Sequence, residues 1–492
     1  MQPINRLPKD IFILIPRFFT NEEWAHDTFP MNRPLITMTH VCRSWRNTLI
    51  ATPSLWTQID FSTSEFQQAE GFLGRSRKQL LDVYQFFESE DDVEPFLSAT
   101  LGNISRLRWL KIESCFPYFE RVLIQLRRKA PELKHLIIGN KPIMADREMT
   151  LPSTIFKGQL PKLTSLSLHN IRTNLCDFNL PSLTRFIFIT ATKTSVLDLT
   201  SSLKGCPSLE FVQLNLDYMP QLPTPPPRKR VQLAALKELK LNETACTSGL
   251  LDHLILPKCT EMTLRGHFTG EKSDYHGNPA SRIHPSSIDH LPVMRGIIKA
   301  VAMPNSCILS GSNGNLRIWC FERTRGDFNA GYFTSFSPIP VLDIRELWVG
   351  QRGNSTRGLW GQTLSGVLSA FKVFSKVEGL TILRCKTEAF FTTLGSTTDG
   401  GILLPGLRRL TIYVGSGDLD VKALVQCAKT RKEHFRPIEE VDVVLGRELD
   451  ASFVQETESL REFVGQLSCR VGKAPKLDYN MEDIPGCKVG LR

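Results

Sequence analysis

Two patterns of apolar positions divide the chain. In the first sixty residues, apolar side chains recur every three or four positions, along residues 7–19 and again along residues 38–49. This spacing is typical of amphipathic helices, so it predicts two helices joined by a polar loop over residues 20–34. Pro16 lacks a backbone N–H and clashes with the preceding turn, so we expect it to kink or end the first helix. The second helix should stop before Pro53.

A different pattern begins after about residue 60, where the frame apolar-x-x-apolar-x-apolar recurs. Alternate residues of a strand face the same side, so each frame predicts a short strand with one apolar face. Successive frames begin 20 to 33 residues apart, except for one interval of 85 residues that leaves room for about three more units. Residues 79–85 (QLLDVYQ) are a candidate earlier strand. The frames begin at Leu107, Leu133, Leu163, Leu183, Leu209, Leu236, Cys259, Ile344, Val377, Leu407 and Ile438.

This frame, repeated at this interval, resembles the leucine-rich repeat. Each unit of that family is a short strand with a helical or irregular return, and it buries its leucines only by stacking on its neighbours. The Asn or Cys that the family places after the strand is present at Cys115 and Cys385 but is mostly missing, so the repeats are degenerate. The resemblance implies an α/β leucine-rich-repeat solenoid.

The helical opening carries a second resemblance. The segments INRLPKDI (residues 4–11), VCRSWR (41–46) and ATPSLW (51–56) resemble the F-box motif, and especially the F-box-like domains of large fungal families. The expected order is therefore a small all-α F-box-like module, a connector with a first divergent repeat, degenerate repeats, and a C-terminal cap or tail. The corresponding boundaries are 1–62, 63–104, 105–445 and 446–492.

An F-box followed by leucine-rich repeats resembles the substrate receptors of SCF-type ubiquitin ligases. The resemblance implies that the F-box binds the Skp adaptor, which links to a cullin scaffold with its RING subunit, while the repeats hold an unidentified target protein. Such a receptor makes no covalent bond and contributes by positioning the target. The alternative is a leucine-rich-repeat interaction scaffold without a ligase role, in the nucleus.

The adaptor-facing residues carried over from the motif are Leu7, Pro8, Ile11, Ile15, Val41, Cys42 and Trp45, with Leu49 and Trp56 shared between the interface and the core of the module.

Large side chains at outward strand positions are the candidates for target binding. The apolar frame positions point inward, so the residues between them should lie on the open face of the sheet. Aromatic residues are enriched at binding hot spots. The alternative is that a neighbouring loop covers each of them. The candidates are Trp109, Lys111, Phe211, Trp348 and Tyr413.

Two local motifs stand apart from the repeats. Residues 313–319 (NGNLRIW) resemble the last strand of a WD-repeat blade, but no second copy follows at the period of about 40 that a propeller needs. We interpret them as one strand within the long interval. Residues 225–231 (PPPRKRV) look like a basic nuclear-import signal. The interpretation that we favour is a proline-rich surface loop, and both remain open.

Composition limits the partners and the compartment. The twelve cysteines are scattered without a CxxC pair, which favours reduced thiols used as small apolar fillers, in the cytoplasm or the nucleus. No apolar run is long enough to cross a bilayer, and Pro16 and Arg17 interrupt the one segment that could pass for a signal peptide. We therefore expect no membrane partner. The net charge of +10 would matter for nucleic acid only if it were concentrated on one face, so no nucleic-acid partner is expected.

Motifs that would indicate an enzyme are missing from the sequence. No GxSxG, HExxH or Walker A segment occurs, and the ten histidines have no metal-ligand spacing. We expect no catalytic residues, no metal and no cofactor.

Overall fold

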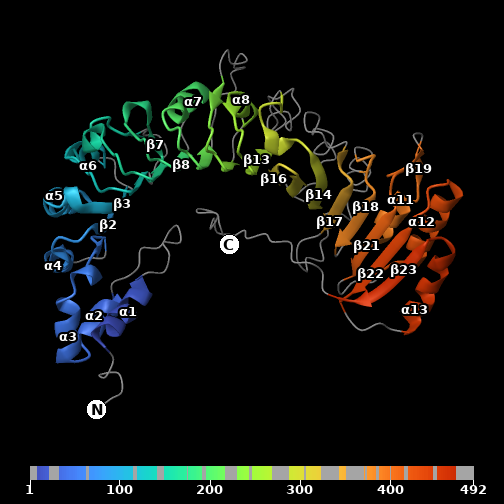
Figure 1. Cartoon of the computed structure of the whole chain (residues 1–492), viewed down its shortest axis with the longest axis horizontal. Helices are drawn as coiled ribbons and strands as arrows, with labels where there is room; N and C mark the ends of the chain where they lie inside the picture. The colour runs from blue at the N-terminus through green and yellow to red at the C-terminus, as the bar shows by residue number, and fades with distance from the viewer. Residues whose placement is uncertain are drawn as a thin grey trace. The chain divides into compact units, whose positions relative to one another are not determined.

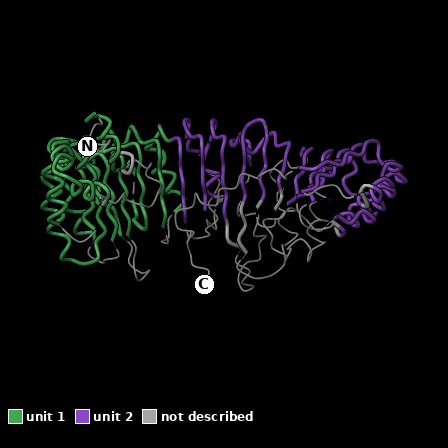
Figure 2. Tube along the Cα trace, turned by 90° about the horizontal axis from the view of Figure 1, so that it is seen from below, with its two compact units in different colours: residues 1–209, 478–492 green, residues 210–477 purple. Residues whose placement is uncertain are grey.

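A computed structural model describes most of the chain as two compact units, shown in Figure 2. Unit 1 holds the described residues up to Leu209, and unit 2 those from Glu210 onward. Both are mixed α/β and are built on mostly parallel strands. The described residues are 8–20, 33–62, 66–114, 119–140, 149–173, 175–190, 195–216, 230–242, 247–268, 287–303, 306–322, 343–350, 371, 374–383, 387–398, 401–414, 419–446 and 451–472.

Unit 1 opens with helix α1, Lys9–Thr20, which continues through Pro16. Of the two outcomes expected at Pro16, a kink or the end of the helix, the second is therefore wrong. A proline inside a helix costs about 3 kcal/mol through its missing N–H and its clash with the preceding turn. Burial offsets that cost, because Pro16 and Phe12 are both buried and the Phe12 ring packs edge-on against Trp45 at 4.8 Å.

The second predicted helix is in fact two short helices, α2 at Arg33–Thr39 and α3 at Arg43–Ile50. Between them Cys42 is extended, with φ −158°, and its Sγ accepts a hydrogen bond from the Trp45 amide at 3.5 Å. Cys42 thus caps α3 at the point where we expected a continuous helix. The end of α3 at Ile50, before Pro53, is as predicted.

Trp56 connects these helices to the rest of unit 1 through a hydrogen bond to Leu49 and a ring contact with Phe72. It follows a 3-10 turn at Pro53–Leu55, is fully buried, and donates its indole N–H to the Leu49 carbonyl at 2.9 Å. Its ring packs against Phe72 of helix α4, Phe66–Ser76, with 4.9 Å between ring centroids. The helical opening is therefore anchored on α4.

Six parallel strands form the sheet of unit 1. The frame residues of adjacent strands stand in register, so that Leu110 pairs with Leu136, Leu136 with Leu166, and Leu166 with Phe186. All four are almost fully buried. Residues 79–85 do contain a strand, β2, which begins slightly later than predicted. The strands are β1 Gln58–Asp60, β2 Leu81–Phe87, β3 Leu107–Ser114, β4 His135–Asn140, β6 Ser165–His169 and β8 Arg185–Thr190.

Helices and 3-10 turns return the chain between these strands, and Figure 1 shows α4, α5 and α6 along one face of the sheet. The frame residues point to this face, where Phe87, Phe96 and Phe119 form a chain of ring contacts in the core. The returns of unit 1 after α4 include α5 Val93–Leu101, α6 Phe119–Gln125, α7 Val196–Lys204, and 3-10 turns at Glu90–Asp92, Ile104–Arg106, Ile155–Gly158 and Leu175–Asp177.

Unit 2 repeats this arrangement and extends it beyond the last predicted frame. Strand β23, Gln466–Val471, pairs in parallel with β22, and helix α13, Ala451–Glu458, precedes it. Part of the expected cap or tail is therefore one more strand with its helix. The strands at predicted frames are β9 Phe211–Leu216, β11 Glu238–Asn242, β13 Glu261–Phe268, β17 Glu346–Gly350, β18 Gly379–Leu383, β21 Arg409–Val414 and β22 Glu440–Leu445. The other helical segments are α8 Thr247–Asp252, α11 Thr387–Leu394, α12 Val421–Glu433, and 3-10 turns at Pro292–Met294 and Ser459–Glu462.

The long interval without frames contains an antiparallel meander rather than three strand–helix units. Strands β14, Ile297–Met303, β15, Ser306–Gly311, and β16, Gly314–Glu322, follow one another, and β15 is antiparallel to both neighbours. β16 lies parallel to β13, and β14 lies parallel to β17. The expectation of about three more repeats is therefore wrong for the described part of this interval, because β14–β16 pair with one another as antiparallel neighbours and not as successive parallel strands.

Close backbone approaches explain the glycines of this meander. Gly311 and Gly314 pair across a two-residue turn formed by Ser312 and Asn313, the loop length commonest in β-hairpins. A Cβ atom on Gly311 would overlap the Gly296 carbonyl, and one on Gly314, at φ 131°, would overlap the Thr260 carbonyl. The WD-like segment is thus the start of β16, and the turn before it fixes the register with β13.

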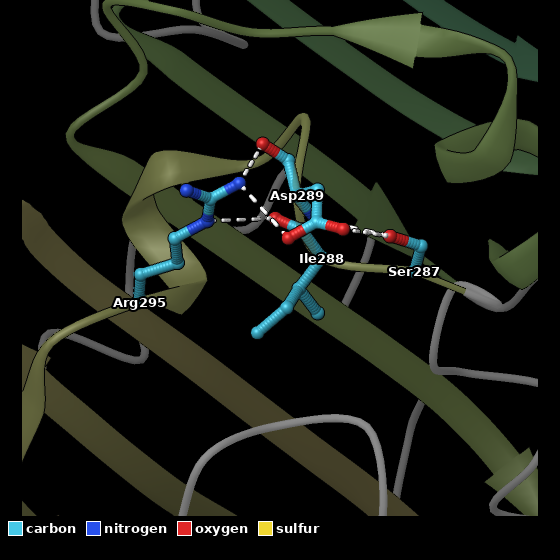
Figure 3. Close-up of polar contacts among 4 residues, drawn as sticks. All are labelled: Ser287, Ile288, Asp289 and Arg295. Carbon is cyan, nitrogen blue, oxygen red and sulfur yellow. Dashed lines mark hydrogen bonds and ion pairs between the residues drawn. The ribbon is translucent and has the colours of Figure 1, made fainter.

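A polar clip holds the loop that enters β14, as Figure 3 shows. The Arg295 guanidinium donates to the Asp289 carboxylate at 3.2 Å and to the Ile288 carbonyl at 3.4 Å, while Ser287 Oγ donates to the same carboxylate at 3.1 Å. The Asn313 amide in turn donates to the Arg295 carbonyl at 3.3 Å. The clip therefore ties the entry loop to the turn between β15 and β16.

Three two-stranded ribbons lie outside the main sheet: β5 Met149–Thr150 with β7 Ile171–Arg172, β10 Val231–Gln232 with β12 Leu254–Ile255, and β19 Thr397–Thr398 with β20 Gly401–Ile402. Most of the segment that looks like a nuclear-import signal, residues 225–229, lies outside the described residues.

Several cysteines fill the apolar core, as the sequence predicted. Cys206, Cys259, Cys307 and Cys427 are buried. Loss of solvation raises the pKa of Cys206 to about 11 and that of the other three to about 12. These thiols therefore stay protonated and unreactive at neutral pH.

The Gly314→Ala substitution should lower the free energy of unfolding more than Gly401→Ala. Both glycines have positive φ, 131° and 96°, but only Gly314 has backbone within contact distance of the added Cβ. We expect a loss of about 1–2 kcal/mol for Gly401→Ala from the left-handed backbone, and about 2 kcal/mol more for Gly314→Ala from overpacking. Urea unfolding of both variants measures the difference. Equal losses would contradict the register of the meander.

Candidate protein-docking surfaces

Helices α1–α3 expose apolar side chains in the segments that resemble the F-box. Ile11 is 47% exposed on α1 and Val41 is 57% exposed between α2 and α3. Pro8 is also exposed. Leu7 lies outside the described residues. Three of the predicted adaptor-facing residues are therefore accessible to a partner.

The other predicted adaptor-facing residues are less accessible. Ile15, Cys42 and Trp45 are half-buried, since Cys42 caps α3 and Trp45 packs on Phe12. Leu49 and Trp56 are fully buried, so their predicted share in an interface is wrong and only their core role remains. The indole bond from Trp56 to the Leu49 carbonyl explains why the two are buried together.

Two exposed residues of the helical opening were not among the predicted site residues. Leu14 is 53% exposed and lies three positions after Ile11 on α1, so both occupy one side of that helix. Ile50 is 39% exposed at the end of α3. The helical spacing from Ile11 was the signal that could have identified Leu14.

The open face of unit 1, on the side away from its helices, carries a buried polar cluster on β2, β3 and β4. The Lys111 ammonium lies 3.2 Å from the Glu113 carboxylate and 5.3 Å from the centroid of the Tyr84 ring. Tyr84 donates its hydroxyl to Glu113 at 3.4 Å, and burial, followed by the charge of Glu113, raises the pKa of Tyr84. Gly139 pairs with Glu113 and leaves room for its side chain. Lys111 is therefore held inside the protein rather than offered to a target.

Trp109 is only 8% exposed, which contradicts its predicted exposure. It does point to the open face, but its in-register neighbours are Asp82 on β2 and His135 on β4. Arg108 holds Asp82 through hydrogen bonds to both carboxylate oxygens. Burial is also the main cause of the lowered pKa of His135. Side chains on adjacent strands stand about 4.8 Å apart, so long neighbours cover one another on this face.

Of the candidates on unit 2, Phe211 is also buried, at 8% exposure, with the Lys240 ammonium 5.3 Å from its ring centroid. Trp348 and Tyr413 are half-buried. The Lys299 ammonium lies 4.1 Å from the centroid of the Trp348 ring, within the range of a cation–π contact. Trp348 and Tyr413 are therefore the more accessible aromatics among the candidates.

Charged side chains lie beside these two aromatics on β17–β23. Glu346, Gly379 and Arg409 stand in one row across β17, β18 and β21. Gly379 has no side chain in the way, so the Arg409 guanidinium reaches over it to pair with Glu346. Arg470 on β23 binds the Asp442 carboxylate at 2.8 Å and 3.2 Å. The arrangement suits polar recognition beside an aromatic anchor.

The described part of the chain contains no group of three or more His, Cys, Asp or Glu residues that could hold a metal ion. Among the same residues, no helix is long and apolar enough to cross a membrane. A scan of protein-family models finds no match to this chain, and a search of curated proteins also finds none.

The two tryptophans on the open faces should respond differently to substitution. Trp109→Ala should lower the free energy of unfolding by about 3–5 kcal/mol, because it empties a buried site. Trp348→Ala should lower it by less, since part of that ring is already in water. Thermal melting of both variants provides the comparison. An equal fall in melting temperature would show that Trp348 is a core residue and not part of an accessible surface.

Proposed function

We propose that this chain is the non-catalytic substrate-recognition subunit of an SCF-type ubiquitin ligase. Helices α1–α3 form an F-box-like module that binds the Skp adaptor, and through it the cullin and RING subunits. The observation that carries the proposal is the exposure of Ile11 and Val41 within the segments that resemble the F-box. Exposed aliphatic side chains on a small anchored module are suited to form the centre of a protein interface.

The remainder of the chain is a degenerate leucine-rich-repeat solenoid in this proposal. Support comes from parallel strands that stack with frame residues in register, as Leu380 does with Leu347 and Leu410. Further support comes from the helices and 3-10 turns that return the chain between strands. The antiparallel meander of β14–β16 is an insertion in this series.

Target recognition falls to the open face of the strands. On unit 2 this face offers Trp348 and Tyr413, with Arg409 and Arg470 beside them. Tryptophan, tyrosine and arginine are the residues most enriched at interface hot spots. The receptor contributes by raising the effective concentration of a target lysine near the ubiquitin thioester, so its own residues need only bind and orient.

Substitution of the exposed aliphatic residues tests adaptor binding. Ile11→Ser and Val41→Ser should each reduce the affinity for purified Skp adaptor at least tenfold, since truncation of an interface anchor typically costs 2 kcal/mol or more, about thirtyfold in affinity. Surface plasmon resonance with the full-length chain measures this. The melting temperature should not change, because both side chains are already about half in water.

Leu197→Ser is the matched control. Leu197 lies on α7 and is 58% exposed, as Val41 is 57% exposed, but it is outside the F-box-like segments. The control should bind the adaptor as the wild-type chain does. If all three variants bind equally well, the adaptor proposal is wrong, and a scaffold without a ligase role becomes the better explanation.

A further inference from the structure

Positive charge is concentrated in the loops that precede strands β2, β3, β4 and β6 of unit 1. These loops, residues 77–80, 101–106, 126–134 and 155–164, carry nine lysine and arginine side chains but only one acidic residue, Glu132. Because the strands are parallel, all four loops lie side by side at the amino-terminal ends of the strands, which we call the amino edge of the sheet. The sequence alone could not show that part of the net charge of +10 gathers on one edge.

Backbone hydrogen bonds hold these loops against one another. The Lys134 amide donates to the Arg108 carbonyl at 2.8 Å, and the Thr164 amide donates to the Lys134 carbonyl at 2.8 Å. Further from the strands, the Phe156 amide donates to the Leu126 carbonyl at 2.7 Å. The cations are therefore carried on a fixed backbone, in adjacent layers.

Most of these cations have no carboxylate partner. Lys162 pairs with Glu132 at 2.7 Å, and Arg106 bonds only to neutral oxygens, such as the Ser76 hydroxyl at 2.9 Å. Seven others are exposed and form no ion pair with any described residue. We call these seven the amino-edge ridge. They are Arg77, Lys78, Arg127, Arg128, Lys129, Lys134 and Lys157.

Stabilisation of helix ends explains only part of the ridge. Cations near helix C-termini interact favourably with the last carbonyl groups. Arg127 does so at Ile124, at 2.7 Å, and Arg128 does so at Leu101, at 3.0 Å. Within the described part of the chain, the other five ridge side chains make no hydrogen bond.

On the corresponding edge of unit 2 most of the cations before β17, β18, β21 and β22 are paired, which provides an internal comparison. There, Lys376 pairs with Asp343 at 2.7 Å, Arg345 with Glu378 at 3.4 Å, and Arg408 with Glu439 at 3.7 Å. Loops that precede parallel strands can therefore carry cations that are paired with carboxylates. The excess of cations in unit 1 is a property of that unit and not a requirement of the strand–loop architecture.

We propose that the amino-edge ridge binds the phosphate backbone of a nucleic acid, without sequence specificity. Lysine and arginine side chains that neutralise phosphates supply most of non-specific nucleic-acid affinity. Four loops at the usual strand spacing span about 14 Å, a length over which duplex DNA carries about eight phosphates. This binding is independent of the adaptor-binding role proposed above.

The chemistry of the ridge favours nucleic acid over a protein or a membrane. The large apolar side chains exposed among the described residues all lie outside these four loops. A protein interface generally has an apolar or aromatic centre, and a membrane-surface site has apolar residues that insert between lipids. A ridge of cations alone matches a phosphate backbone best.

The test compares two full-length variants with equal net charge. The ridge variant replaces Arg77, Lys129, Lys134 and Lys157 with Gln. The control variant replaces the exposed Lys258, Lys422, Lys429 and Arg436 of unit 2 with Gln. Fluorescence polarisation with a labelled 20-nucleotide single-stranded RNA of mixed sequence gives the affinity of each chain at 50 and 200 mM salt.

The ridge variant should bind at least tenfold more weakly than wild type at 50 mM salt, whereas the control should change less than threefold. The slope of log affinity against log salt should fall by about 3 in the ridge variant, since each lost phosphate contact removes about 0.7 from the slope for a single strand. Equal losses in the two variants would overturn the proposal. Equally tight binding of polyglutamate would also overturn it in favour of an acidic protein, and binding of vesicles with 30% phosphatidylserine but not of RNA would overturn it in favour of a membrane.

Discussion

In-register stacking of short parallel strands is the interaction on which the rest of the structure depends. A single strand with three apolar residues on one face cannot bury them alone, so each unit needs a neighbour on either side. The row of Val349, Ile382 and Ile412 shows how neighbours bury one another. Ile382 lies between the other two, and all three side chains are almost fully buried. The same register brings loops and outward side chains from distant parts of the sequence into rows. Both the aromatic surface of unit 2 and the cations of unit 1 result from it.

The strands of this stack could be predicted from sequence because their burial pattern is local. For example, β4 is predicted by its own apolar residues alone, Leu133, Leu136 and Ile138. The meander could not be predicted in the same way. The apolar frame is missing from this interval, and the order of its strands depends on which distant strands β14 and β16 pair with. Arg431 is a further example, because a charged residue predicts exposure, yet it is fully buried and donates to the Leu403 and Leu404 carbonyls at 2.7 and 2.8 Å.

The candidate surfaces were predicted less well than the strands, for a physical reason. Strand alternation placed Trp109 on the correct face, but exposure depends on the length of the side chains beside it, which periodicity does not contain. In the helical opening, Trp56 matched the motif but serves the core, since its indole N–H finds its acceptor at Leu49 inside the protein. A motif therefore indicates which segment is involved, and burial decides which of its residues a partner can touch.

Two different kinds of surface thus belong to one chain: aliphatic on the helical opening, and aromatic with paired charges on the strands of unit 2. In the proposed function each surface contacts a separate protein partner, and the chain would bring the two partners together. Hydrogen–deuterium exchange of the full-length chain, alone and with purified Skp adaptor, tests this division most directly. The account predicts slower exchange in α1–α3 when the adaptor is bound, and unchanged exchange in the strands of unit 2. Unchanged exchange in α1–α3, or protection in unit 2 instead, would contradict it.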